Sequence, residues 1–249
     1  MKDSVVEFRG ANNVLCLEGS VHLNSARLRF YGSDSVIYIC ESKRAFSGTV
    51  NVWNSCSFCI GPNYSFNGNS SIVMVSEYSC VFIGADAMFA SGVVIRTADP
   101  HLIYDCFTGS RINPTQSVCI GDHVWLGQAC TLLKGVVVGP GSVLGGDAVV
   151  TKDVPSNAIA AGNPARIVKS NICWARPSVH AFTREDTKHW DHINPSAFTY
   201  QAAEASDWSN GIKSMASGEA VMAQDRLGFL TEVIRNTGKN RFATGHAES

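Results

Sequence analysis

Large apolar residues recur at every sixth position in the middle of this chain, with a second, smaller residue two places before each. The large positions are Ile120, Leu126, Leu132, Val138, Leu144 and Val150, and the smaller ones are Val118, Val124, Cys130, Val136, Ser142 and Ala148. A helix repeats every 3.6 residues and a strand every two, so neither alone gives this period. A six-residue repeat is typical of a parallel β-helix, in which stacked coils bury their aliphatic residues in one column. Ordinary consecutive strands of a sandwich would not keep one register over six hexads.

The same phase recurs upstream and weakens toward the N-terminus. Two further sets of three apolar residues have the same six-residue spacing. They are Ile83, Phe89 and Ile95, and Ile60, Phe66 and Ile72. Before Ile60 the apolar residues predict strands in less regular coils, as expected for the first coils of a stack. The sequence therefore predicts an all-β fold, a parallel β-helix over residues 1–170.

The phase breaks between Ile95 and Ile120, where residues 97–117 contain prolines, aspartates, arginines and one histidine. A long excursion from a regular coil that also carries apolar residues indicates a functional loop. From 171 to 249 the six-residue period is absent. This C-terminal extension is predicted to be helical near 217–236, where Leu227, Leu230 and Val233 share a face, and to fray over its last residues, 239–249.

Composition narrows the class of protein. Of 249 residues, 45% are apolar and 16% charged, with a net charge of −1, so nothing indicates nucleic acid or an anionic membrane as partner. No apolar run is long enough to cross a bilayer, and no signal peptide is evident. The chain has nine cysteines, and only Cys56 and Cys59 form a CxxC motif. A zinc site would need a second such pair, so we interpret the cysteines as reduced residues of the core. These features favour a cytoplasmic location and give no support for a metal site.

The segment "IGDHVWLGQACTLLKGVVVGPGSVLGGDAVVTKDVPSNAIAAGNPARIVK" resembles the hexapeptide-repeat acyltransferases. It is most similar to their O-acetyltransferase branch, and "SRINPTQSVCIG" and "GNPARIVKSNICWAR" resemble bacterial polysialic acid capsule O-acetyltransferases. The resemblance implies a left-handed β-helix, acetyl-CoA as co-substrate, no metal, and a homotrimer with sites between adjacent β-helices. It also implies a saccharide acceptor, which the capsule-like phrases suggest is a surface glycan that can contain sialic acid.

The resemblance implies that His101, on the excursion, is the general base and that Trp125 lines the site beside the thiol end of the cofactor. A histidine side chain titrates near neutrality (about 6.5), which suits a base. Asp99, Asp105 or a backbone carbonyl can orient its ring, and the sequence does not choose among them. His123 is the rival base. Its ring is expected on the coil surface, so replacing it should have little effect.

Five positions match coenzyme A contacts of the family: Gly146, Thr151, Lys152, Arg166 and Lys169. A glycine lets the pantetheine arm approach, a threonine hydroxyl can donate a hydrogen bond, and the cations suit phosphates. Two alternatives stay open: an N-acetyltransferase acting on an amino-sugar nucleotide, and a non-catalytic β-helix scaffold. A carbonic anhydrase on this fold would need a third histidine near His101 and His123, which the sequence lacks.

Overall fold

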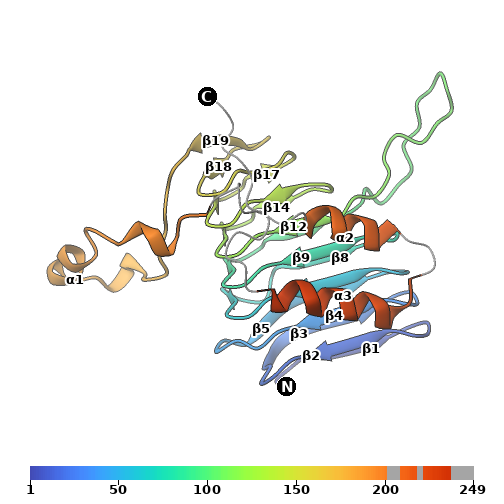
Figure 1. Ribbon diagram of the computed structural model, residues 1–249, viewed down its shortest axis with the longest axis horizontal. Coiled ribbons are helices and arrows are strands. Elements are labelled where there is room, and N and C mark those ends of the chain that lie inside the picture. The colour runs from blue at the N-terminus through green and yellow to red at the C-terminus, as the bar shows by residue number, and fades with distance from the viewer. Residues whose placement is uncertain (201–207, 218–220, 237–249) are drawn as a thin grey trace.

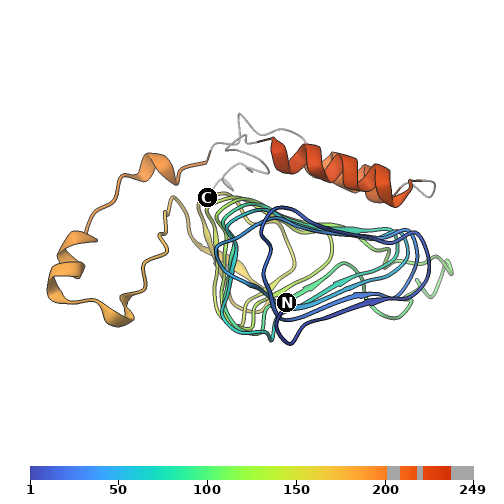
Figure 2. The ribbon, with the colours of Figure 1, turned by 90° about the horizontal axis from the view of Figure 1, so that it is seen from below.

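The computed structural model describes residues 1–200, 208–217 and 221–236, and its strands wind into a left-handed parallel β-helix with three faces (Figure 1). Seen along the stack, the coils superpose as a rounded triangle (Figure 2). Each full coil crosses the first, second and third face in turn. The predicted fold class is confirmed.

The strands of each face pair in parallel, apart from the last pair, β18 with β19, which is antiparallel. The first face contains β1 (Val5–Phe8), β3 (Leu23–Phe30), β5 (Phe46–Val52), β8 (Ile72–Val75), β11 (Val94–Arg96), β14 (Thr131–Leu132) and β17 (Val149–Val150). The second face contains β2 (Val14–Leu17), β4 (Val36–Ile39), β6 (Ser57–Ile60), β9 (Cys80–Ile83), β12 (Val118–Ile120) and β15 (Val137–Val138). The third face contains β7 (Ser65–Phe66), β10 (Met88–Phe89), β13 (Trp125–Leu126), β16 (Val143–Leu144), β18 (Ile159–Ala161) and β19 (Arg166–Lys169).

The hexad residues form the core of the β-helix. All six large positions from Ile120 to Val150 are at most 1% exposed, and so are the six smaller ones two places before them. Leu132 pairs with Val150 across the first face, 18 residues or three hexads later. Because each coil repeats the previous one in register, identical positions stack into one apolar column.

The coils nearer the N-terminus are longer. Leu28 pairs with Val50, and Val50 with Val73, at separations of 22 and 23 residues. The expectation that Ile72 points inward is wrong: Val73 is 5% exposed and Ile72 37%. One extra residue before β8 shifts the phase, and because strand side chains alternate, a one-residue shift reverses which of them face the core.

Two C-terminal helices cover the second face. Its outward side chains are themselves apolar, among them Tyr38, Phe82 and Cys119, and they pack against α2 (Trp208–Ser217) and α3 (Ala223–Arg235). From α3, Leu230 and Val233 are fully buried in this contact. Helix α3 falls within the predicted range 217–236, whereas α2 was not expected. Residues 218–220 and the predicted frayed end, 239–249, lie outside the described residues.

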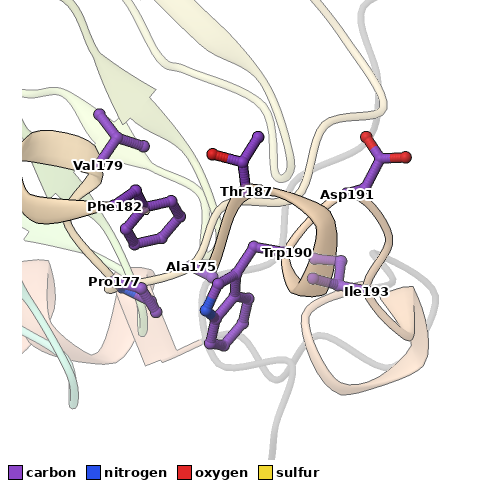
Figure 3. Close-up of a pocket in the computed structure, with 8 residues that line it drawn as sticks. All are labelled: Ala175, Pro177, Val179, Phe182, Thr187, Trp190, Asp191 and Ile193. Carbon is purple, nitrogen blue, oxygen red and sulfur yellow. The ribbon is translucent and has the colours of Figure 1, made fainter. Parts of the chain in front are cut away.

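Between the β-helix and these helices, residues 175–198 form an arm that extends away from the third face (Figures 1 and 2). It contains two short 3₁₀ turns (Val179–Ala181 and Pro195–Ala197) and the helix α1 (Arg184–His189), which begins at a capping box made by Thr183 and Asp186. The apolar side chains of Pro177, Phe182 and Trp190 lie together beside a hollow of 530 Å³ (Figure 3).

His123 fastens the root of this arm to the coils. Its ring stacks on Trp174 at 3.9 Å, and the indole N–H of Trp174 donates to the His123 carbonyl at 3.0 Å. The ring nitrogens face two acceptors, Asp86 Oδ2 at 2.5 Å from Nδ1 and the Trp174 carbonyl at 3.0 Å from Nε2. The expectation that the His123 ring lies on the coil surface is therefore wrong, because the segment around Trp174 covers it to 4% exposure.

Asp86 completes this anchor. Besides His123, its carboxylate accepts a hydrogen bond from Arg176 Nε at 2.6 Å. Burial raises the pKa of Asp86, but the hydrogen bond from His123 and the charge of Arg176 outweigh burial and hold that pKa below its ordinary value. The arm is therefore tied to the third face by a charged cluster as well as by stacked rings.

We expect His123→Ala to lower the free energy of unfolding by about 2 kcal/mol, since it removes a buried hydrogen bond to a charged partner. Thermal unfolding measures this loss, and hydrogen exchange of the peptide around Trp174 should accelerate. The control is His192→Ala, because that side chain is 94% exposed. Unchanged exchange around Trp174 would contradict the anchoring role.

Candidate active site

The predicted loop, residues 97–117, leaves and rejoins the coil through two buried hydroxyl residues. Thr97 is 0% and Ser117 4% exposed. Thr97 Oγ1 accepts the backbone N–H of Ser76 at 2.9 Å, and Ser117 Oγ accepts that of Cys80 at 3.0 Å. Both ends of the loop are thereby fixed to the preceding coil, at the corner between the first and second faces.

Asn113 organises the base of the loop. It is 5% exposed, its side-chain carbonyl accepts the N–H of Ile103 at 2.9 Å, and its amide donates to the His101 carbonyl at 2.8 Å and to Asp99 Oδ2 at 3.2 Å. Asn113 thus sets the backbone position of His101. Sequence reasoning missed it, since a polar residue before a proline in a loop is not a specific signal.

An ion pair braces the returning strand of the loop. Arg111 donates two hydrogen bonds to Glu77, at 2.5 and 2.8 Å, and the Thr115 hydroxyl donates a third at 2.5 Å. The hydrogen bonds from Arg111 and then Thr115 lower the pKa of Glu77 to about 2. The carboxylate therefore stays charged through any physiological pH and keeps its hold on the loop.

The His101 side chain is exposed at this corner, and neither candidate carboxylate orients its ring. Asp99 accepts a hydrogen bond from Lys134 Nζ at 2.6 Å, which lowers the Asp99 pKa. Asp105 accepts the N–H groups of Thr108 and Phe107 in a turn at the loop tip, which lowers its own pKa. Both carboxylates shape the loop, so the imidazole is left open to a ligand or a neighbouring chain.

Trp125 lies on the third face, between Met88 and Val143 in the parallel ladder. Its side chain points outward, as predicted, and is 39% exposed. Its indole is 6.0 Å from that of Trp174 at the root of the arm. The third face is opposite the corner that carries His101, so the two predicted catalytic residues do not meet within one chain.

The five predicted coenzyme positions fall on different parts of the β-helix. Thr151 and Lys152 follow β17 at the corner that carries His101, two coils farther along the stack, or about 10 Å at the usual strand spacing. Gly146 follows β16 at the corner between the third and first faces. Arg166 and Lys169 are exposed on β19, at the end of the third face.

Gly146 differs from the other corner glycines because the fold does not require it. Its backbone is outside the left-handed region, and an added Cβ would lie 3.5 Å from the Gln128 carbonyl oxygen, an ordinary contact. At Gly127 the same atom would be 2.4 Å from the Leu144 oxygen, so a side chain cannot fit there. Gly146 therefore leaves open surface that a ligand can approach closely.

Two other findings concern the described part of the chain. Its His, Cys, Asp and Glu side chains do not form a cluster of three or more that could hold a metal ion. None of its helices is long and apolar enough to cross a membrane.

Known proteins resemble this chain in sequence and in fold. A polysialic acid O-acetyltransferase of Neisseria meningitidis is 34% identical over 178 residues, which are 71% of this chain and 82% of that protein. A protein of the same name from Escherichia coli O1:K1 / APEC is 37% identical over 115 residues, 46% of this chain and 38% of its own. The crystal structure of the polySia-specific acetyltransferase NeuO superposes with a TM-score of 0.58 and 28% identity, covering 76% of this chain and 98% of that one.

No protein-family model matches the chain. The extent of the Neisseria alignment nevertheless shows the family, and the matching solved structure has the same fold. The chain therefore belongs to the hexapeptide-repeat O-acetyltransferases, the family that includes these polysialic acid enzymes.

Proposed function

We propose that this O-acetyltransferase moves the acetyl group of acetyl-CoA to a hydroxyl of a saccharide, with His101 as general base. The observation that carries the proposal is an exposed imidazole, free of intramolecular partners in the described residues, on a loop fixed at both ends. A saccharide acceptor is supported by the relatives named for acetylation of polysialic acid. Acidic surface glycans that contain sialic acid are the first acceptors to test.

Acetyl-CoA supplies an activated thioester. His101 accepts the proton of the acceptor hydroxyl while the hydroxyl oxygen attacks the thioester carbonyl, and the ring then gives this proton to the departing sulfur. Coenzyme A leaves as the free thiol and the acceptor carries the new ester. Lys152, Arg166 and Lys169 offer charge for the coenzyme phosphates, while Thr151 and Gly146 flank the first face along which the pantetheine arm would run.

The distribution of these residues supports a site shared by two copies. One corner of the β-helix carries His101 and Lys152, and the region around the opposite face carries Trp125 and Gly146. In a ring of identical subunits, the first set of one copy would face the second set of the next. We therefore propose that a homotrimer forms the active sites in its clefts.

His101→Ala should lower kcat by about 10²–10⁴-fold, the usual effect of removing a positioned base. Binding of coenzyme A, measured by calorimetry, should remain unchanged. The control is His22→Ala, an exposed histidine in the first coils. Near-normal turnover of His101→Ala would overturn the assignment.

Mixing inactive chains tests the shared site. His101→Ala and Trp125→Ala proteins should each be inactive, yet when unfolded and refolded together they should regain about a quarter of wild-type activity, because random assembly pairs the intact residues in that fraction of clefts. Refolding each variant alone is the control. Full inactivity of the mixture, with trimers present by light scattering, would show that both residues act within one chain.

Gly146→Ala should leave the melting temperature unchanged or slightly higher, since the backbone tolerates an L-residue there. It should raise KM for acetyl-CoA about tenfold if the pantetheine arm passes within contact of this corner. Gly127→Ala is the contrasting variant and should destabilise the fold, because its Cβ would overlap the Leu144 carbonyl. An unchanged KM in Gly146→Ala would place the coenzyme elsewhere.

A further inference from the structure

A pocket of 500 Å³ lies on the N-terminal side of the loop, at the same corner as the predicted base. Its lining includes Trp53, Met74, Tyr78, Arg96, His101 and Leu102. The coils that form it precede the loop, whereas Lys152 and β19 follow it. His101 therefore stands between this pocket and the residues proposed for the coenzyme. The volume is within the range of about 300–1,000 Å³ that is usual for small-molecule sites.

Arg96 supplies a free positive charge to the pocket. It is the last residue of β11, its side chain is exposed, and no residue in the described part of the chain pairs with it. The other charged groups of the lining are already neutralised: Arg111 by Glu77, and Asp99 by Lys134 outside the pocket. The pocket thus has an unbalanced cation, with a fork of donors that fits a carboxylate.

The aromatic residues suit the ring of a sugar. Trp53 stacks on Tyr31 with ring centroids 5.2 Å apart, which fixes the orientation of its indole. Tyr78 is 43% exposed and forms another part of the lining. A pocket that combines aromatic surface with a few placed polar groups holds and orients a small ligand.

Building on the proposed function, we propose that this pocket is the acceptor subsite and that Arg96 binds an acidic group of the saccharide. The ring of the sugar packs against Trp53 and Tyr78, and its reacting hydroxyl points toward His101. The acceptor enters from the N-terminal side of the loop and acetyl-CoA from the C-terminal side. Arg96 is then a specificity-determining residue that selects acidic over neutral saccharides.

The test measures binding directly as well as turnover. An α2,8-linked trimer of sialic acid and its carboxyl methyl ester are titrated into full-length wild-type protein and Arg96→Gln, and acetylation of both probes is followed. A sulfated neutral trisaccharide distinguishes a requirement for a carboxylate from one for any anion. The control is Arg27→Gln, an exposed arginine on the same face but outside the pocket.

We expect Arg96→Gln to weaken binding of the acidic trimer about 10–100-fold, the range for a charge-assisted pair, and to raise KM with little change in kcat. Wild-type protein should bind the methyl ester as weakly as the variant does, and Arg27→Gln should behave as wild type. Equal binding of acid and ester, no binding of either, or an unaffected Arg96→Gln would each overturn the proposal.

These outcomes separate the two proposals. If Arg96→Gln acetylates the acid normally while His101→Ala does not, the acceptor subsite is wrong and the proposed reaction stands. If the wild type binds the acid through Arg96 but transfers no acetyl group to any saccharide, the subsite stands and the proposed function is wrong. Tighter binding of the sulfated probe than of the sialic acid trimer would overturn the proposal that Arg96 recognises a carboxylate. It would indicate instead that the subsite binds sulfate esters.

Discussion

The column of apolar side chains inside the coils constrains every other part of this protein. A parallel coil adds to the previous one only where its inward residues continue that column, so register leaves almost no freedom along the faces. Loops, insertions and polar side chains can therefore occur only at the corners of the coils and at outward-facing positions. The loop that carries His101, the glycine that leaves surface open and the arm root at Trp174 all lie at such places. The regular stack of coils therefore sets the distances between the residues of the proposed site.

The three faces have different partners. The second face is covered by α2 and α3, whereas no helix of the described residues packs along the first or third face. In the proposed trimer, the helices on the second face would leave the first and third faces for contacts between copies. The hydrogen-bonded cluster of Asp86, His123 and Arg176 directs the arm away from the third face.

Periodicity predicted the coils after Ile83 to the residue, because each inward side chain there is buried in the column that the period describes. It failed at Ile72, where one extra residue changed the phase without changing the composition. The helices over the second face were only half predicted, since their positions depend on a surface formed by distant strands. The His123 ring could not be placed from the sequence, because Trp174, 51 residues away, covers it. Asn113, Asp99 and Asp105 likewise have roles set by loop geometry that no local pattern encodes.

The cysteines differ in exposure, and this difference suggests a site for attaching a chemical label. Burial raises the pKa of Cys119 and Cys130 to about 12 and that of Cys80 well above its ordinary value, so these sulfurs remain protonated and shielded. Cys106 is the one exposed cysteine among the described residues, and it lies in the loop that carries His101. Only thiolates react readily with alkylating dyes. With the half-buried Cys16 and Cys173 replaced, a fluorophore attached at Cys106 would report the arrival of a ligand at the loop.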